Sequence, residues 1–429
     1  MKAAERFLDN LKKGKHTLDS SEVGTGKTVV AAYLAKQLGM RVGVVCPKSV
    51  IPMWDREMID MGVEPDFILN YEKLRTGKTA FLKKRGKKIM NWCLDGATFV
   101  IFDEVHKCKG AYTLNAQLLI SLVLEAKKKR GHLVHAISAT ASEDPTEMRS
   151  LGFMLGLHDL NKHPNSWVQW MLDNGCEANH WGSWEIIYTN KLLDVHRAMY
   201  GEQGGAYRLS IKDFPDSFKE NRVFVEPIHF KDQSGIEDAY DSLGITADVV
   251  EQFIDGELEP EDLIIVRILR ARQQAESLKI PDIIDMTTDL IGHGKSVVVF
   301  MNFRDSVERL ASQLNCAKIV GGQSDNERQN AIDDFQMDIK RVLVVNIAAG
   351  GTGLSLHDIH GVYPRVSLIN PTFAAKDHVQ ALGRIHRNGA KSHALQKILV
   401  AAGSVEETVV KAIKRKIKNL NTLHTGSHE

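Results

Sequence analysis

The chain has 429 residues, a hydrophobic share of 43%, a charged share of 25% and a net charge of +1. These values exclude a largely disordered chain and are typical of a globular protein with two or three domains. No apolar run reaches the roughly 18–20 residues of a membrane span, and the N-terminus lacks the apolar core of a signal peptide, so we expect a cytoplasmic protein. The five cysteines are odd in number and include no CxxC pair, which argues against a disulfide framework and a zinc site.

The first chemical motif is SEVGTGKT at 21–28, close to the phosphate-binding pattern GxxxxGK[ST], with Ser21 at the first glycine position. Gly24 and Gly26 allow the loop to point backbone N–H groups at phosphate oxygens, and a helix is predicted to begin there. Lys27 is expected to reach the β- and γ-phosphates, and Thr28 to offer its hydroxyl to Mg²⁺. The residues expected to bind ATP here are Glu22, Val23, Gly24, Thr25, Gly26, Lys27 and Thr28.

Three segments of the first half are predicted to be strands, at 41–47, 98–104 and 132–140, with helical patterns between them. Each is rich in β-branched residues and nearly continuous in apolar residues, which is typical of a strand buried on both faces. The alternation of strands and helices predicts an α/β fold with a parallel sheet covered by helices.

The second chemical motif follows the strand at 98–104, which ends in Asp103 and Glu104 and is followed by His106. Ligand sites of open α/β sheets lie at the carboxyl ends of strands. Asp103 is therefore expected to hold Mg²⁺, and Glu104 to orient and deprotonate the attacking water. The alternative is that the two carboxylates only begin a solvated helix.

Between about 145 and 290 the pattern becomes helix-like, irregular and aromatic. Four of the six tryptophans lie close together, at Trp167, Trp170, Trp181 and Trp184. We favour the small core of a helical insertion, because large aromatic side chains are usually buried. The alternative is a platform for stacking bases or a surface for a protein partner.

The second half again alternates strands and helices, with strands predicted at 296–301, 317–320, 341–347, 365–370 and 395–402. We therefore predict an N-terminal ATP-binding domain over 1–225, with a helical protrusion at about 145–215. A C-terminal domain is predicted over 226–429, with a helical segment at about 231–290.

The last motif is QALGRIHRNG at 380–389. Arg384 and Arg387 are three residues apart, so we expect them to share one helix face and to point into a cleft. Guanidinium groups suit the charge of phosphoryl transfer, and their supply from a second domain makes hydrolysis depend on domain closure. A glycine-rich turn at 350–356, which includes Gly353, follows a predicted strand and allows a close approach to phosphates.

These motifs, in this order, resemble those of the superfamily 2 helicases, and most closely the Swi/Snf-type DNA translocases. The resemblance implies two RecA-like lobes, built of parallel sheets flanked by helices, with helical insertions between them. It implies ATP and Mg²⁺ as cofactors and DNA as the partner. It assigns coupling roles to Ser138 and Thr140, and it implies that the segment 44–58 touches the DNA backbone. Its catalytic residues would be Lys27, Asp103, Glu104, Arg384 and Arg387, with Gly353 and Gln380 also at the nucleotide.

The motif ending GRIHRNG departs from the Swi/Snf pattern and is more similar to viral or phage helicases, for which the location would be the host-cell cytoplasm. We therefore expect a DNA translocase or helicase acting on duplex or forked DNA, in replication or repair. Two alternatives stay open. One is an RNA helicase of the same superfamily. The other is a regulatory ATPase activated by a protein partner that binds the insertion from Trp167 to Trp184.

Overall fold

The computed structural model describes residues 2–86, 89–129, 131–163, 165–179, 182–255, 258, 263–350 and 354–426. The chain forms two compact units. The first contains Met1–Asp213 and Ile417–Glu429, and the second contains Phe214–Lys416. The predicted boundary between two domains, after residue 225, stays a prediction.

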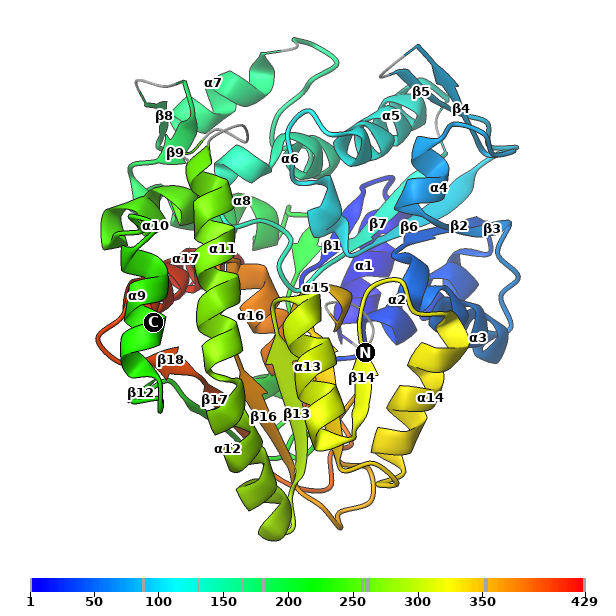
Figure 1. Ribbon diagram of the computed structural model, residues 1–429. Coiled ribbons are helices and arrows are strands. Elements are labelled where there is room, and N and C mark those ends of the chain that lie inside the picture. Colours follow the sequence, from blue (N-terminus) through cyan, green and yellow to red (C-terminus); the bar gives the residue numbers. More distant parts are fainter. Residues whose placement is uncertain are drawn as a thin grey trace. The chain divides into compact units, whose positions relative to one another are not determined.

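The first unit contains a sheet of six parallel strands in the order β10-β1-β7-β6-β2-β3 (Figure 1). The strand bounds are β10 (Ala206–Tyr207), β1 (Thr17–Asp19), β7 (Leu133–Ile137), β6 (Thr98–Asp103), β2 (Arg41–Cys46) and β3 (Phe67–Asn70). The three strands predicted in this half are confirmed as β2, β6 and β7.

Helices cover both faces of this sheet, and the strand side chains alternate between two cores. Phe99 and Ile101 of β6 pack in a core with residues of α1, α2 and α3. Val100 and Phe102 pack in the opposite core with residues of α5, α6 and α8. This double burial explains the continuous apolar sequence of the strand. The helix bounds are α1 (Lys2–Lys12), α2 (Lys27–Leu38), α3 (Ile51–Met61), α4 (Tyr71–Arg75), α5 (Leu114–Lys129), α6 (Arg149–Leu155), α7 (Ser166–Asp173) and α8 (Leu192–Tyr200).

Two small antiparallel sheets complete the first unit, β4 (Leu82–Arg85) with β5 (Ile89–Trp92) and β8 (Cys176–Ala178) with β9 (Trp184–Ile186). Trp167 of α7 is buried in a small cluster with Met171 and Cys176, against which Trp170 and Trp184 pack. The expected tryptophan core is confirmed for these residues, and Trp181 lies outside the described residues.

The second unit contains another six-stranded parallel sheet, in the order β11-β17-β16-β13-β15-β14. The bounds are β11 (Asn221–Phe224), β17 (Ala394–Ile398), β16 (Arg365–Ile369), β13 (Ser296–Met301), β15 (Val342–Asn346) and β14 (Ala317–Ile319). Strands β12 (Pro227–Ile228) and β18 (Val400–Ala401) follow β11 and β17 along the chain and pair with each other in a separate short sheet. The strand predicted at 395–402 is therefore interrupted at Leu399. The α/β fold class with parallel sheets is confirmed.

The helices of the second unit follow the predicted alternation. Four come before the sheet strands β13 to β17, namely α9 (Gln233–Asp241), α10 (Ala247–Asp255), α11 (Leu263–Leu278) and α12 (Ile280–Gly292). The others are α13 (Arg304–Leu314), α14 (Asp325–Gln336), α15 (Ile347–Gly350), α16 (Ala375–Leu382) and α17 (Glu406–Thr425), whose residues from Ile417 belong to the first unit. Within the described residues, no helix is long and apolar enough to cross a membrane.

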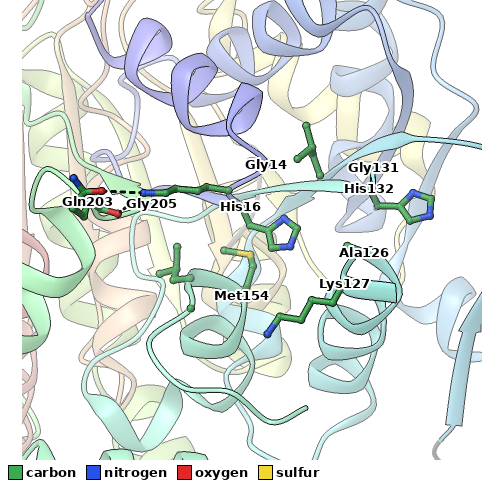
Figure 2. Close-up of a pocket in the computed structure, with 13 residues that line it drawn as sticks. Gly14, His16, Ala126, Lys127, Gly131, His132, Met154, Gln203 and Gly205 are labelled. Carbon is green, nitrogen blue, oxygen red and sulfur yellow. Dashed lines mark hydrogen bonds between the residues drawn. The ribbon is translucent and has the colours of Figure 1, made fainter. Parts of the chain in front are cut away.

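A cavity of about 610 Å³ lies in the first unit beside His16, Lys127 and Leu133 (Figure 2). His16 immediately precedes β1, and Leu133 begins β7. The cavity is therefore at the amino ends of these strands, whereas the phosphate-binding motif follows the carboxyl end of β1. The cavity is therefore separate from the phosphate-binding motif, and we do not take it as the candidate functional site.

Candidate nucleotide site

Three predicted motifs meet because their strands are neighbours in the first sheet. Strand β7 lies between β1 and β6, and all three run parallel. The loop 20–26 follows β1, Ser138 follows β7, and Asp103 ends β6. The carboxyl edge of the sheet therefore brings the phosphate loop and the two carboxylates together, as ligand sites in this type of sheet require.

The phosphate loop turns sharply through two glycines. Gly24 and Gly26 adopt φ angles of 84° and 88°, in the left-handed region that favours glycine, and α2 begins at Lys27. The Lys27 Nζ donates to the backbone oxygens of Ser21, at 2.7 Å, and Glu22, at 2.8 Å. Val23 and Thr25 lie on either side of Gly24 in this turn, and Thr28 lies in the first turn of α2.

Removal from water lowers the pKa of Lys27, and the negative charges of Asp19, Glu104 and Asp103 oppose that shift. Asp19 was not predicted from the sequence. It is 1% exposed, and its Oδ1 accepts a hydrogen bond of 2.9 Å from the Ser21 backbone N–H. Burial raises the pKa of Asp19, while the charge of Lys27 lowers it. The loop is thus supported from beneath by a buried carboxylate.

Asp103 is oriented by two donors. The Trp54 Nε1 donates to its Oδ2 at 2.8 Å, and the Glu104 backbone N–H donates to its Oδ1 at 2.9 Å. Burial, followed by the charge of Glu104, raises the pKa of Asp103 to about 7, and the Trp54 hydrogen bond opposes that rise. Trp54 is fully buried, so this residue makes no contact with a nucleic acid, and the contact of segment 44–58 with DNA stays a prediction for its exposed residues. Spacing alone does not reveal that its indole points into the protein.

Glu104 has a φ of 53° and a ψ of 50°, a left-handed conformation that is uncommon for a residue other than glycine. A short 3₁₀ turn, Val105–Cys108, follows it, in place of a regular solvated helix. Because such strained residues cluster at functional sites, this geometry supports a chemical role for the Glu104 carboxylate.

A series of close polar contacts connects Glu104 to the segment that follows β7. The His106 Nδ1 lies 3.1 Å from the Glu104 Oε2 and 3.1 Å from the Ser138 Oγ. The Ser138 Oγ accepts a bond of 3.3 Å from the Thr140 backbone N–H. Because a carboxylate only accepts, the His106 Nδ1 carries the hydrogen. Thr140 takes part through its backbone N–H, and the coupling roles that the resemblance assigns to Ser138 and Thr140 stay predictions.

The segment after β10 supports the loop from the other side. The Arg208 Nη1 donates to the Ser20 backbone oxygen and, at 3.2 Å, to that of Ala139. The Glu22 Oε2 accepts a bond of 2.9 Å from the Ile211 backbone N–H. Residues about 190 positions apart in sequence thus fix the loop, a role that the sequence did not reveal.

A buried series of hydrogen bonds connects His424, near the end of α17, to Ser20. The His424 Nε2 lies 2.9 Å from the Ser142 backbone oxygen, and its Nδ1 is bonded to the Tyr200 hydroxyl, which is 2.7 Å from the Ser20 Oγ. A carbonyl only accepts, so Nε2 carries the hydrogen of a neutral imidazole and Nδ1 accepts from Tyr200. Burial lowers the pKa of His424 to about 3, in agreement with the neutral form.

The two arginines of the last motif lie in the second unit. Helix α16 ends at Leu382 with Gly383 as its C-cap, so the expected shared helix face for Arg384 and Arg387 is wrong. Both arginines instead bond to residues in the second half of the glycine-rich turn at 350–356. The Arg384 Nη1 donates to the Leu354 oxygen at 3.4 Å, and the Arg387 Nη1 donates to the Ser355 Oγ at 3.0 Å.

The remaining two predicted residues of this unit are Gln380 and Gly353. Gln380 is 6% exposed within α16. Gly353 lies outside the described residues.

The donor set of the first unit fits a nucleotide with a divalent metal. The loop offers backbone N–H groups and the Lys27 ammonium, and Thr28 offers a hydroxyl that forms no hydrogen bond within the described residues. Asp103 and Glu104 add two carboxylates, and oxygen ligands of this kind suit Mg²⁺. Within the described residues, no cluster of three or more His, Cys, Asp or Glu side chains forms a separate metal site.

Comparisons with known proteins agree with this arrangement. Residues 279–389 match the model of the helicase conserved C-terminal domain. Over 96% of its length the chain is 29% identical to a putative ATP-dependent RNA helicase of Acanthamoeba polyphaga mimivirus, of which it covers 80%. It is 30% identical to a DNA repair protein of Candida glabrata, but this match covers only 29% of the chain and 11% of that relative.

Among solved structures, a Mycobacterium smegmatis helicase bound to single-stranded DNA and AMP-PNP matches 98% of the chain. Its TM-score is 0.51 and its identity is 15%, and the chain spans 48% of its length. At this identity the match shows the fold, two RecA-like lobes. The sequence relatives, which include Swi/Snf-like proteins and a viral putative helicase, identify the chain as an ATP-hydrolysing, nucleic-acid-dependent enzyme similar to the superfamily 2 helicases.

Proposed function

We propose that the chain couples ATP hydrolysis to movement along duplex or forked DNA. The observation that carries the proposal is the chain of contacts from Glu104 through His106 to Ser138 and Thr140. It connects the carboxylate beside the nucleotide to a second strand end. A change in the position of Glu104 on hydrolysis would therefore move the segment after β7, as a motor requires.

In the proposed mechanism, the loop and Lys27 bind the ATP phosphates, and Thr28 and Asp103 hold Mg²⁺. The metal supplies positive charge that offsets the charge of the phosphates. Glu104 orients the attacking water and accepts its proton. Arg384 and Arg387 supply positive charge for the transition state from the second unit, and Gln380 and Gly353 bind near the nucleotide.

The choice of DNA rests on the Swi/Snf-like relatives, which include a DNA repair protein of Candida glabrata and a chromatin remodeling factor of Schizosaccharomyces pombe. These names also support a role in DNA replication or repair. Both matches cover less than a third of the chain. The viral relative, which covers far more of the chain and is named as a putative RNA helicase, favours the second candidate function, an RNA helicase.

The test is the steady-state ATPase rate without nucleic acid and with single-stranded DNA, duplex DNA, forked DNA or RNA, using Glu104→Gln as the inactive control. Duplex or forked DNA should stimulate the rate most strongly. Stimulation by RNA alone would replace the proposal with the RNA helicase. No stimulation by any of them would leave a regulatory ATPase activated by a protein partner.

A further inference from the structure

A positively charged hairpin lies between α4 and β6 in the first unit (Figure 1). In its antiparallel register, Leu82 of β4 faces Trp92 of β5, and Lys83 faces Asn91. Leu82 and Trp92 are buried, whereas Lys83 and Arg85 are exposed. Because successive side chains of a strand point to opposite faces, one face of the hairpin packs on the protein and the other carries cations.

The buried face fixes the hairpin to the first unit. The Trp92 Nε1 donates to the Leu118 backbone oxygen and the Ser121 Oγ of α5, both at 3.1 Å. On the other side, Gly77 has a φ of 65°, and a Cβ added to it would lie 2.2 Å from the Lys84 Cβ. This close approach requires glycine. The cations of the exposed face are therefore presented on an anchored backbone.

In the part of the chain that the structure describes, no carboxylate pairs with the cations of the exposed face. Lys78 forms a bridge with Lys83, so two lysines lie directly opposite each other, an arrangement that is destabilising in a sheet. The sequence contains no Asp or Glu from 73 to 94. Within the described residues, Lys78, Lys83 and Arg85 form no ion pair, and the preceding Glu72 is paired with Arg75 at 3.5 Å. Lys87 and Lys88 lie outside the described residues.

We propose that Lys78, Lys83 and Arg85 bind the phosphate backbone of the nucleic acid. The inference rests on the proposed function, and it adds a contact surface outside the motifs of the nucleotide site. A bound polyanion reduces the repulsion between Lys78 and Lys83. Because the backbone of the hairpin is already fixed, it loses little conformational entropy on binding. Since phosphate contacts carry no sequence information, this surface positions any sequence equally.

The test compares two triple variants that lose the same charge. The first is Lys78→Gln, Lys83→Gln and Arg85→Gln in the hairpin. The control is Lys12→Gln, Lys13→Gln and Lys36→Gln, three exposed lysines in or next to α1 and α2. Binding of labelled duplex and single-stranded DNA and RNA is measured over a range of salt concentrations, together with the ATPase rate without nucleic acid.

For duplex DNA, the slope of log K against log salt should become shallower by about 2–3 in the hairpin variant, because each phosphate contact contributes about 0.9. The control slope and both basal ATPase rates should stay at the wild-type values. An unchanged slope in the hairpin variant, or an equal change in the control, would overturn the hairpin proposal alone. If the wild-type chain binds neither DNA nor RNA, the hairpin proposal and the proposed function both fall.

Discussion

The candidate residues of the two units differ in charge. In the first unit, Asp19, Asp103 and the half-buried Lys27 lie around the carboxyl ends of β1 and β6, so opposite charges compensate one another in a poorly solvated site. In the second unit, the candidates are the cations Arg384 and Arg387. In the proposed mechanism this difference corresponds to a division of labour, in which the first unit would bind the nucleotide and accept the proton, and the second would add positive charge during the reaction.

The two units also differ in how these groups are held. Asp103 and the loop are positioned by Trp54, Arg208 and Tyr200, which lie outside the phosphate-binding motifs. Arg384 and Arg387 bond instead to residues 354 and 355, which belong to the glycine-rich turn of their own unit. Distant substitutions should therefore affect the first site more than the second.

Loss of Lys27 tests the binding role of the first unit and should have the largest effect. Lys27→Ala removes the only cation of the phosphate loop, so ATP binding should weaken and ATP turnover should be abolished. The steady-state ATPase rate and binding of a fluorescent ATP analogue measure the effect. Lys36→Ala, on the exposed side of the same helix, is the control and should match the wild type. Normal turnover in Lys27→Ala would refute the assignment of the loop.

Loss of Arg387 tests the role of the second unit. Arg387→Ala should retain ATP binding but lose turnover by about 1,000-fold, because a guanidinium of this kind acts mainly in the transition state. Ser355→Ala removes the hydroxyl partner of Arg387 while the charge stays, and it should cost far less. If Arg387→Ala weakens binding as much as turnover, the division of labour between the units does not hold.

Loss of the Trp54 hydrogen bond tests the support from outside the motifs. In Trp54→Phe, Asp103 keeps its carboxylate but loses one of two donors, so the Mg²⁺ concentration for half-maximal ATPase activity should rise about 10–100-fold. Trp92→Phe is the matched control, since its indole also donates a buried hydrogen bond but contacts α5. If the two variants require the same Mg²⁺ concentration, the Trp54 hydrogen bond does not position Asp103 for the metal, and Trp54 contributes only to packing.

The elements that could be predicted from the sequence are those with local signals. Strands β2, β6 and β7 were predicted because each is five or six residues long and apolar on both faces. Strands β1 and β10 have only three and two residues, too few for a periodic pattern. The phosphate loop and the Asp103–Glu104 pair were recognised as candidates because their chemistry fixes residue types at short spacing, and their roles stay predictions.

The supporting contacts could not be predicted, because they join distant parts of the chain. Arg208 reaches Ser20 across 188 residues, and no local pattern marks that partner. Trp54 lies on α3, where the spacing of apolar residues predicts which face of the helix is buried. It does not predict that the Trp54 indole donates to the Asp103 carboxylate. For Arg384 and Arg387, the sequence suggested a continued helix, whereas Gly383 ends α16 before both arginines.

The smallest expected effect concerns the pH dependence of stability in the first unit. Burial lowers the pKa of His424 to about 3, whereas an unfolded chain has a histidine pKa of about 6.5. As the pH falls below about 6.5, the unfolded state gains a proton that the folded state does not, so folding stability is lost. By pH 5 this histidine alone lowers the free energy of unfolding by about 2 kcal/mol relative to neutral pH. His135, whose pKa burial also lowers to about 3, acts in the same direction.

His424→Gln removes this titration together with the hydrogen bond to Tyr200, whereas Tyr200→Phe removes the hydrogen bond and keeps the imidazole. At pH 7 each variant should be less stable than the wild type by about 1 kcal/mol. In thermal unfolding between pH 7 and pH 5, the deficit of His424→Gln should shrink, because only the wild type carries the acid penalty. The deficit of Tyr200→Phe should stay constant. Parallel curves for both variants would mean that His424 has the same pKa in the folded and unfolded states, so that burial does not hold its imidazole in the neutral form.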